Sequence, residues 1–145
     1  MSEEAREKLR VAEEHMDNFH RALARGELDK AGEFLWATVN AIVHALALAR
    51  GERLPAKHGA IRNFVKKLAG ELEDKALWDA FRDTEKLHAN FFSPGIFEEE
   101  ELRAMVDNVL NRLIKPLYEL AERELGASPH PPDRGTSGGR RLEKG

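Results

Sequence analysis

Residues 28–49, LDKAGEFLWATVNAIVHALALA, decide the fold of this chain. Their apolar side chains recur three and four positions apart and continue nearly all round the expected helix, with Trp36 off the main stripe. This pattern predicts a central helix that is buried on most of its faces. Asn40 and His44 interrupt the apolar run, so a membrane span is not expected. We therefore predict a soluble, cytoplasmic protein built around residues 28–49.

The segment before this helix predicts a partner for it. Between Ala5 and Leu23 the apolar positions alternate by four and three residues, which places one apolar stripe on one face of a helix. Gly26 then offers a stop, and the second helix starts almost at once. A connection this short predicts a tight antiparallel hairpin of the first two helices.

Three more helices are expected after residue 51. Pro55 suits the first position of a short third helix that ends at Gly70. A fourth helix is expected over residues 77–92, before a Ser-Pro-Gly turn, and a fifth from about residue 97 to 125. Pro116 removes a backbone donor within the fifth helix, so a kink or break is expected there.

Composition is consistent with one folded domain. Of the 145 residues, 41% are hydrophobic and 34% are charged, which is typical of a globular protein with a highly charged surface. The chain has no cysteine and no glutamine, and its many Glu, Lys and Arg residues resemble the composition of heat-adapted proteins. We expect an all-α antiparallel bundle of about five helices over residues 1–125. Residues 126–145, half of them Gly, Pro or Ser, are predicted to form a flexible tail.

Several classes of function lack support in the sequence. Without cysteine there is no thiol nucleophile and no zinc-thiolate site. No phosphate-binding glycine loop or nucleophile elbow occurs, and the net charge of −3 gives no electrostatic case for nucleic acid. A helical repeat scaffold is a weak alternative, because no signature recurs at a fixed period. We expect no cofactor.

The chain has six histidines, a residue type that commonly binds metal ions. Glu85 and His88 have the Glu-x-x-His spacing of di-iron bundles, but such a centre needs two copies and this chain has one. His44 is better explained as a core or interface residue, and His58 as a surface residue at the start of the third helix. We therefore predict no metal site.

The strongest chemical candidate is the stretch from Arg82 to His88. A histidine that titrates near neutrality can move the 2′-hydroxyl proton of RNA, and a guanidinium can bind the phosphate. Residues six positions apart lie about 120° round a helix and about 9 Å along it, so the two side chains would converge more easily if two chains paired about a two-fold axis. The alternative is structural: Arg82 faces solvent, and the His88 ring contacts Thr84 or Asn90 beside Phe91 and Phe92.

A resemblance adds to this hypothesis. The Ala-rich second helix with Trp36, its end at residues 48–51 (LARG), His58, and the string LHANFF at 87–92 resemble the archaeal PaREP1-type proteins. Those proteins are similar to the wider HEPN superfamily. The resemblance covers about residues 11–120, and Phe92 stands where tyrosine would be expected.

The resemblance implies a helical bundle that dimerises and, in active members, cuts RNA without a metal. The HEPN motif is an arginine, often followed by a polar residue, with a histidine after four to six residues; Arg82, Asp83 and His88 match it. In this hypothesis His88 is the general acid or base and Arg82 binds the phosphate. Asp83 is an orienting polar group, and Asn90 supports the imidazole. Related proteins also serve as nucleotide binders or as partners of small nucleotidyltransferases, so a non-catalytic interaction module is the alternative.

Overall fold

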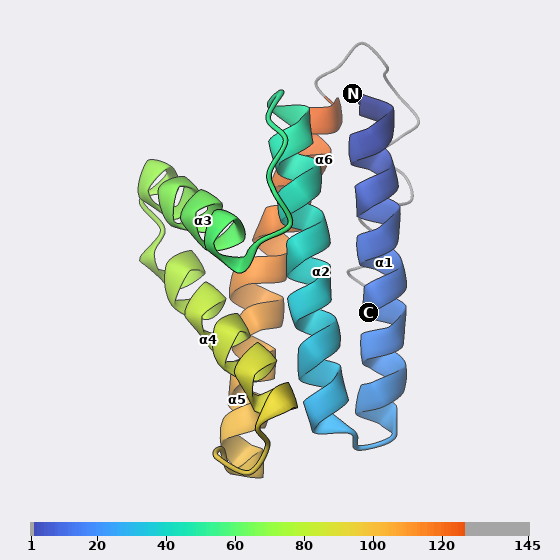
Figure 1. Cartoon of the computed structure of the whole chain (residues 1–145), viewed down its shortest axis with the longest axis vertical. Coiled ribbons are helices and arrows are strands. Elements are labelled where there is room, and N and C mark those ends of the chain that lie inside the picture. The colour runs from blue at the N-terminus through green and yellow to red at the C-terminus, as the bar shows by residue number, and fades with distance from the viewer. Residues whose placement is uncertain (1, 127–145) are drawn as a thin grey trace.

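The computed structural model describes residues 2–126, and over this range the protein is an all-α bundle of five helices, as the sequence predicted (Figure 1). The last helix is one continuous rod in three parts, α5, the π-helical segment η1 and α6. The bounds are α1 Ser2–Ala24, α2 Leu28–Ala49, α3 His58–Leu72, α4 Lys75–Phe92, α5 Glu99–Val109, η1 Leu110–Ile114 and α6 Lys115–Gly126. Of the predicted tail 126–145, all but Gly126 lies outside the described residues.

Helix α2 lies at the centre of the bundle. It contacts α1, α3, α4, α5 and α6, with α1 along one side as the other arm of the predicted hairpin (Figure 1). Buried side chains on α2 include Leu35, Val39, Ile42 and Leu46, all fully enclosed. Because α2 is covered on most sides, its sequence is apolar nearly all round.

The same helix is long and apolar enough to cross a membrane by length and composition. However, 72% of its most apolar window is buried inside the protein, as in the core helix of a soluble protein. The fold therefore explains its hydrophobicity. A cytoplasmic location stays a prediction.

The third helix begins later than the sequence suggested. Pro55 is not its first residue, because the helix starts at His58 after Lys57 in an extended conformation. Leu54 packs against the core, and the two terminal guanidinium nitrogens of Arg53 donate to the Glu4 carboxylate on α1 at 2.8 Å. Residues 52–57 lie outside the helix, with a tight turn in which the Lys57 N–H donates to the Pro55 carbonyl, so the prediction for Pro55 was wrong.

Pro116 does not break the last helix. It is the second residue of α6, directly after the π-helical segment, where the Lys115 N–H donates to the Leu110 carbonyl five residues back. The wider π turn moves the preceding carbonyl groups away from the positions at which a proline ring would clash with them. The expected disturbance at Pro116 therefore takes the form of a π turn within a continuous helical rod.

Two histidines outside the candidate site make stability depend on pH. Burial lowers the pKa of His15 and of His44 below the ordinary value of 6.5; nearby Glu14 partly opposes the shift at His15, whereas Lys8 adds to it at His44. A histidine whose folded-state pKa is lowered contributes stability that is full above 6.5 and is lost as the pH falls below it. We expect the melting temperature to fall between about pH 7.5 and about pH 5. In thermal melts, the double variant His15→Gln/His44→Gln should show a smaller fall, and an unchanged pH dependence would contradict this assignment.

Candidate functional site

Three helices each contribute residues one helical turn apart to a single surface cluster. Because residues three or four positions apart share a helix face, each such pair points the same way. The pairs are Glu33 and Trp36 on α2, His58 and Arg62 on α3, and Glu85 and His88 on α4. We call these six residues the two-histidine site.

Gly32 allows α4 to approach α2 closely beside this site. A Cβ atom at Gly32 would lie 3.2 Å from the Cβ and Cδ2 atoms of Leu87, closer than most side-chain contacts. Glu33 follows Gly32 and His88 follows Leu87 in the sequence. The close contact of the two helices therefore brings Glu33 and His88 within hydrogen-bonding reach.

His88 is held on two sides and open on another. Its Nδ1 atom lies 2.9 Å from Glu33 Oε1, and its ring stacks on Trp36 with centroids 4.5 Å apart and planes at 19°. The side chain is 28% exposed, and Nε2 has no hydrogen-bond partner among residues 2–126 and is not enclosed. If Nδ1–H donates to the carboxylate, Nε2 carries the lone pair and can accept a proton from a substrate.

A second histidine has a similar arrangement. His58 Nε2 lies 2.7 Å from Glu85 Oε2, and the His58 ring meets Trp36 edge-on at 4.9 Å. Glu85 also binds Arg62 at 2.5 Å, and the Arg62 guanidinium lies over the Trp78 ring. The ring centroids of His58 and His88 are 6.2 Å apart.

The four residues proposed from the sequence are not brought together within one chain. Arg82 is exposed and has no ion pair among the described residues. Asp83 accepts a hydrogen bond from Asn108 at 2.9 Å, on a different face of α4 from His88. Asn90 is buried and donates to Asp29 at 2.7 Å, so the imidazole is supported by Glu33 instead.

The alternative account of His88 is correct only in part. The ring is edge-on to Phe92 at 5.3 Å, as a place in the aromatic cluster would require. It does not bond to Thr84, whose hydroxyl donates to the Ala80 carbonyl. His58 is indeed a surface residue, with 48% of its side chain exposed, but it belongs to the same cluster as His88.

Sequence reasoning did not identify Glu33 and Arg62 as site residues. One usable signal was Trp36, which lies off the apolar stripe of α2 together with a carboxylate three residues earlier. On a helix this spacing aligns Glu33 with Trp36, but it does not say which residue of another helix faces them. The partners of Glu33 and Glu85 lie 55 and 27 residues away in the chain.

The arrangement is suited to proton transfer. Each histidine has one nitrogen fixed by a carboxylate, so one ring can act as a base while the other, protonated, acts as an acid. The charge of Arg62 is compensated by Glu85, and the site therefore contains no cation free of a carboxylate partner. Within residues 2–126, no three His, Asp or Glu side chains are grouped so as to hold a metal ion.

Comparison with known proteins places the chain in a family. The model of the archaeal PaREP1/PaREP8 family matches residues 3–111, a segment that contains all six residues of the two-histidine site. No curated protein and no solved structure matches the chain significantly. Because the match spans well over half of the sequence, it confirms the resemblance drawn from Trp36, His58 and the LHANFF string. This chain belongs to the archaeal PaREP1/PaREP8 family.

Proposed function

We propose that this protein is a HEPN-like, metal-independent endoribonuclease that cleaves single-stranded RNA as a homodimer. The observation that carries the proposal is the pair of histidines with ring centroids 6.2 Å apart, each bound to its own carboxylate. At this separation the two imidazoles can each form one hydrogen bond, about 2.8 Å long, to a different oxygen of the same phosphodiester.

The proposed reaction is an internal transfer at phosphorus. Nε2 of His88 accepts the proton of a ribose 2′-hydroxyl, and the 2′-oxygen attacks the adjacent phosphorus. The bond from phosphorus to the 5′-oxygen breaks, and protonated His58 gives its proton to that leaving oxygen. The products are a 2′,3′-cyclic phosphate and a free 5′-hydroxyl. Glu33 and Glu85 fix the ring orientations throughout.

The direct test uses purified protein and single-stranded RNA in the presence of EDTA. We expect cleavage to proceed and to leave 2′,3′-cyclic phosphate ends, while the all-deoxy strand, which lacks the nucleophile, stays intact. An absence of cleavage with and without added divalent metal would overturn the proposal. Cleavage that requires the metal would overturn its metal-independent part.

The proposed reaction needs a positive charge beside the phosphate, and a second copy of the chain can supply it. Negative charge develops on the phosphate during the reaction and needs a cation, but Arg62 is already paired with Glu85. Arg82 is exposed and has no ion pair among the described residues, yet it lies about 120° round α4 from His88. A second copy could supply its Arg82 to the first copy's site.

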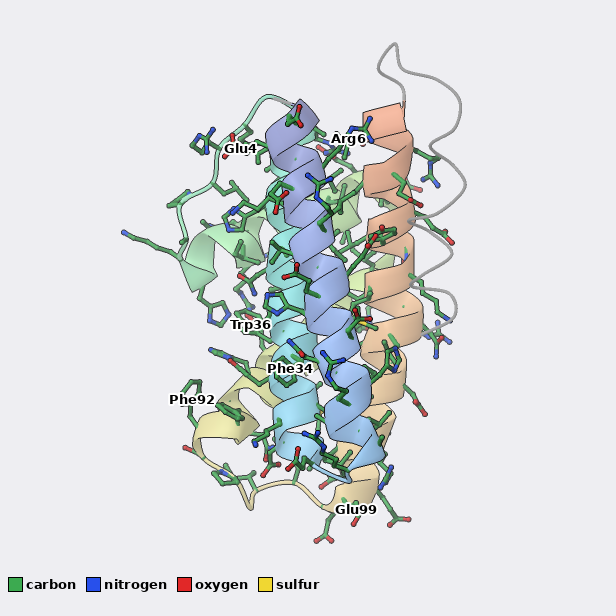
Figure 2. The ribbon with its side chains drawn as sticks, turned by 90° about the vertical axis from the view of Figure 1, so that its right-hand side faces the viewer. Glu4, Arg6, Phe34, Trp36, Phe92 and Glu99 are labelled. Carbon is green, nitrogen blue, oxygen red and sulfur yellow. The ribbon has the colours of Figure 1, made fainter. Side chains whose placement is uncertain are left out.

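The exposed apolar side chains near the site offer a surface for the proposed dimer, and the mass of the protein in solution tests it. Phe92, the last residue of α4, meets the His88 ring edge-on, is 68% exposed and projects from the edge of the molecule (Figure 2), and Ile96 in the turn that follows is 72% exposed. We expect light scattering to give twice the monomer mass, and the double variant Phe92→Glu/Ile96→Glu to give the monomer mass. A monomer across the whole dilution series of the unmodified protein would contradict the composite site.

The same exposed side chains favour the alternative function, a non-catalytic module that binds a partner such as a small nucleotidyltransferase. The two functions separate in one experiment. If the protein is only a binding module, Phe92→Glu/Ile96→Glu should abolish binding to that partner, whereas His88→Ala should leave this binding unchanged. Neither the unmodified protein nor His88→Ala should then cut RNA.

A further inference from the structure

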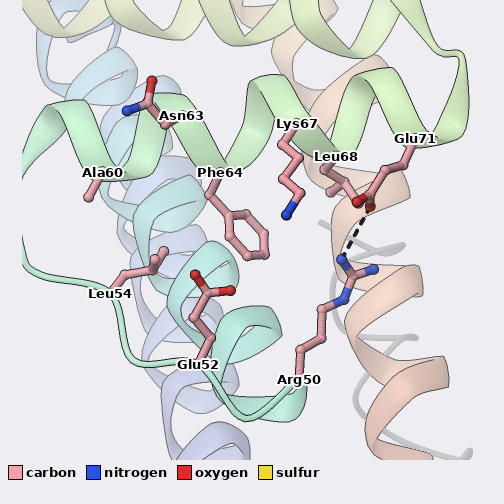
Figure 3. Close-up of a pocket in the computed structure, with 9 residues that line it drawn as sticks. All are labelled: Arg50, Glu52, Leu54, Ala60, Asn63, Phe64, Lys67, Leu68 and Glu71. Carbon is pink, nitrogen blue, oxygen red and sulfur yellow. Dashed lines mark ion pairs between the residues drawn. The ribbon is translucent and has the colours of Figure 1, made fainter.

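A pocket on the other side of α3 shares no residue with the two-histidine site. It lies between α3 and the loop that follows α2, and its volume is about 270 Å³ (Figure 3). Its lining residues are Arg50, Glu52, Leu54, Ala60, Asn63, Phe64, Lys67, Leu68 and Glu71.

The walls of this pocket are fixed by the fold. Arg50 binds both carboxylate oxygens of Glu124 on α6, at 2.9 and 2.7 Å, and also lies 3.6 Å from Glu71 on α3. The backbone N–H of Glu52 donates to the Ala47 carbonyl at 2.8 Å. The loop is therefore held against α2 and connected through Arg50 to two other helices, so the pocket needs little rearrangement to receive a ligand.

Two opposite charges in the pocket lack protein partners. Neither Glu52 nor Lys67 makes a hydrogen bond through its side chain or an ion pair with another of residues 2–126. In Figure 3 both side chains extend toward the ring of Phe64. Because the two charges do not pair with each other, they offer separate contacts for an anion and a cation. Arg50 offers no comparable charge, since two carboxylates already compensate it.

Part of the lining is apolar, from Leu54, Phe64 and Leu68. Leu68 is buried, and Leu54 and Phe64 are partly buried and pack against the core. The volume lies just below the range of about 300–1,000 Å³ that is typical of pockets for drug-sized ligands, which suits a small ligand. A small zwitterion with an apolar group satisfies the carboxylate, the ammonium and the apolar surface together.

We propose that this pocket binds a free α-amino acid with an apolar side chain. The ligand's ammonium pairs with Glu52, its carboxylate pairs with Lys67, and its side chain lies on Phe64 and Leu54. This proposal concerns a separate pocket and holds whether or not the two-histidine site cleaves RNA.

The test is a calorimetric titration of the full-length protein with L-phenylalanine and two blocked analogues. N-acetyl-L-phenylalanine lacks the positive charge, and L-phenylalaninamide lacks the negative charge. Because each analogue loses one charge-assisted contact, we expect each to bind about tenfold more weakly than the free amino acid. No binding of L-phenylalanine at millimolar concentration, or equal binding of all three compounds, would overturn the proposal.

Two variants assign the contacts individually. Lys67→Met should remove the preference for L-phenylalanine over its amide while keeping the preference over the N-acetyl compound, and Glu52→Gln should do the reverse. Lys66→Met, an exposed lysine on the same helix outside the pocket, is the matched control and should keep both preferences. If both preferences persist in Lys67→Met and in Glu52→Gln, these residues are not the ligand's partners and the proposed site is wrong.

Discussion

Replacement of His88, the proposed general base, by alanine is expected to lower the rate of the proposed RNA cleavage by a factor of roughly 100 to 10,000, because a positioned general base contributes about that much. The variant should still fold. The His88 side chain is 28% exposed, and the Glu33 carboxylate that it leaves behind is 26% exposed and can be hydrated. We expect its melting temperature to fall only modestly, which separates a chemical effect from unfolding.

Three further variants make this result specific. His58→Ala should lower the rate to a similar degree, since it removes the proposed acid. His44→Gln, a histidine on α2 outside the two-histidine site, is the matched control and should cleave like the unmodified protein. Glu33→Gln keeps the size of the side chain but removes the charge that orients the imidazole, so it should lower kcat and leave KM nearly unchanged. Equal cleavage by His88→Ala and the unmodified protein would remove His88 from the chemistry.

Replacement of Trp36 by alanine is expected to have the largest effect on stability among the residues of the site. The ring is 8% exposed and contacts Phe81 in the core as well as His58 and His88 at the surface. Truncation of a buried aromatic side chain of this kind costs about 3–5 kcal/mol of unfolding free energy. Because both histidine rings lose the surface on which they rest, cleavage should also fall even under conditions where the variant is folded.

The measurement is chemical denaturation monitored by circular dichroism. Trp36→Phe retains an aromatic ring and removes fewer buried atoms, so it should lose much less than alanine. Trp78→Ala provides a second comparison and should cost less than Trp36→Ala, because Trp78, three residues before Phe81 on α4, stacks on Phe81 but is only partly buried. If Trp36→Ala lost less than about 1 kcal/mol, the ring could not be packed between the core and the two histidines.

The helices themselves were predictable from the sequence because their signals are local. The alternation of four and three in residues 5–23 and the nearly continuous apolar surface of residues 28–49 correctly predicted a hairpin with a buried second arm. The start of α3 was not predictable in the same way. Pro55 is well suited to begin a helix, but the contact of Arg53 with Glu4 and the packing of Leu54 are tertiary, and the helix starts only at His58.

The candidate site shows the same division. His88 was singled out from its own segment, together with Arg82, Asp83 and Asn90, since all four lie on one helix. The structure gives His88 partners from elsewhere: Glu33 and Trp36 on α2, and through Trp36 the second histidine on α3. Arg82 keeps a role only if a second copy of the chain provides one.

By itself, then, the sequence determined which segments are helical and which faces they bury, and it pointed to the ionisable side chains of residues 82–92, because helical periodicity and residue chemistry are written within each segment. Only the tertiary structure decided that His88 meets Glu33, that His58 lies beside it, and that Glu52 and Lys67 face one pocket. These contacts depend on how closely and at what register the helices pack, as at Gly32 against Leu87, and no single segment encodes that.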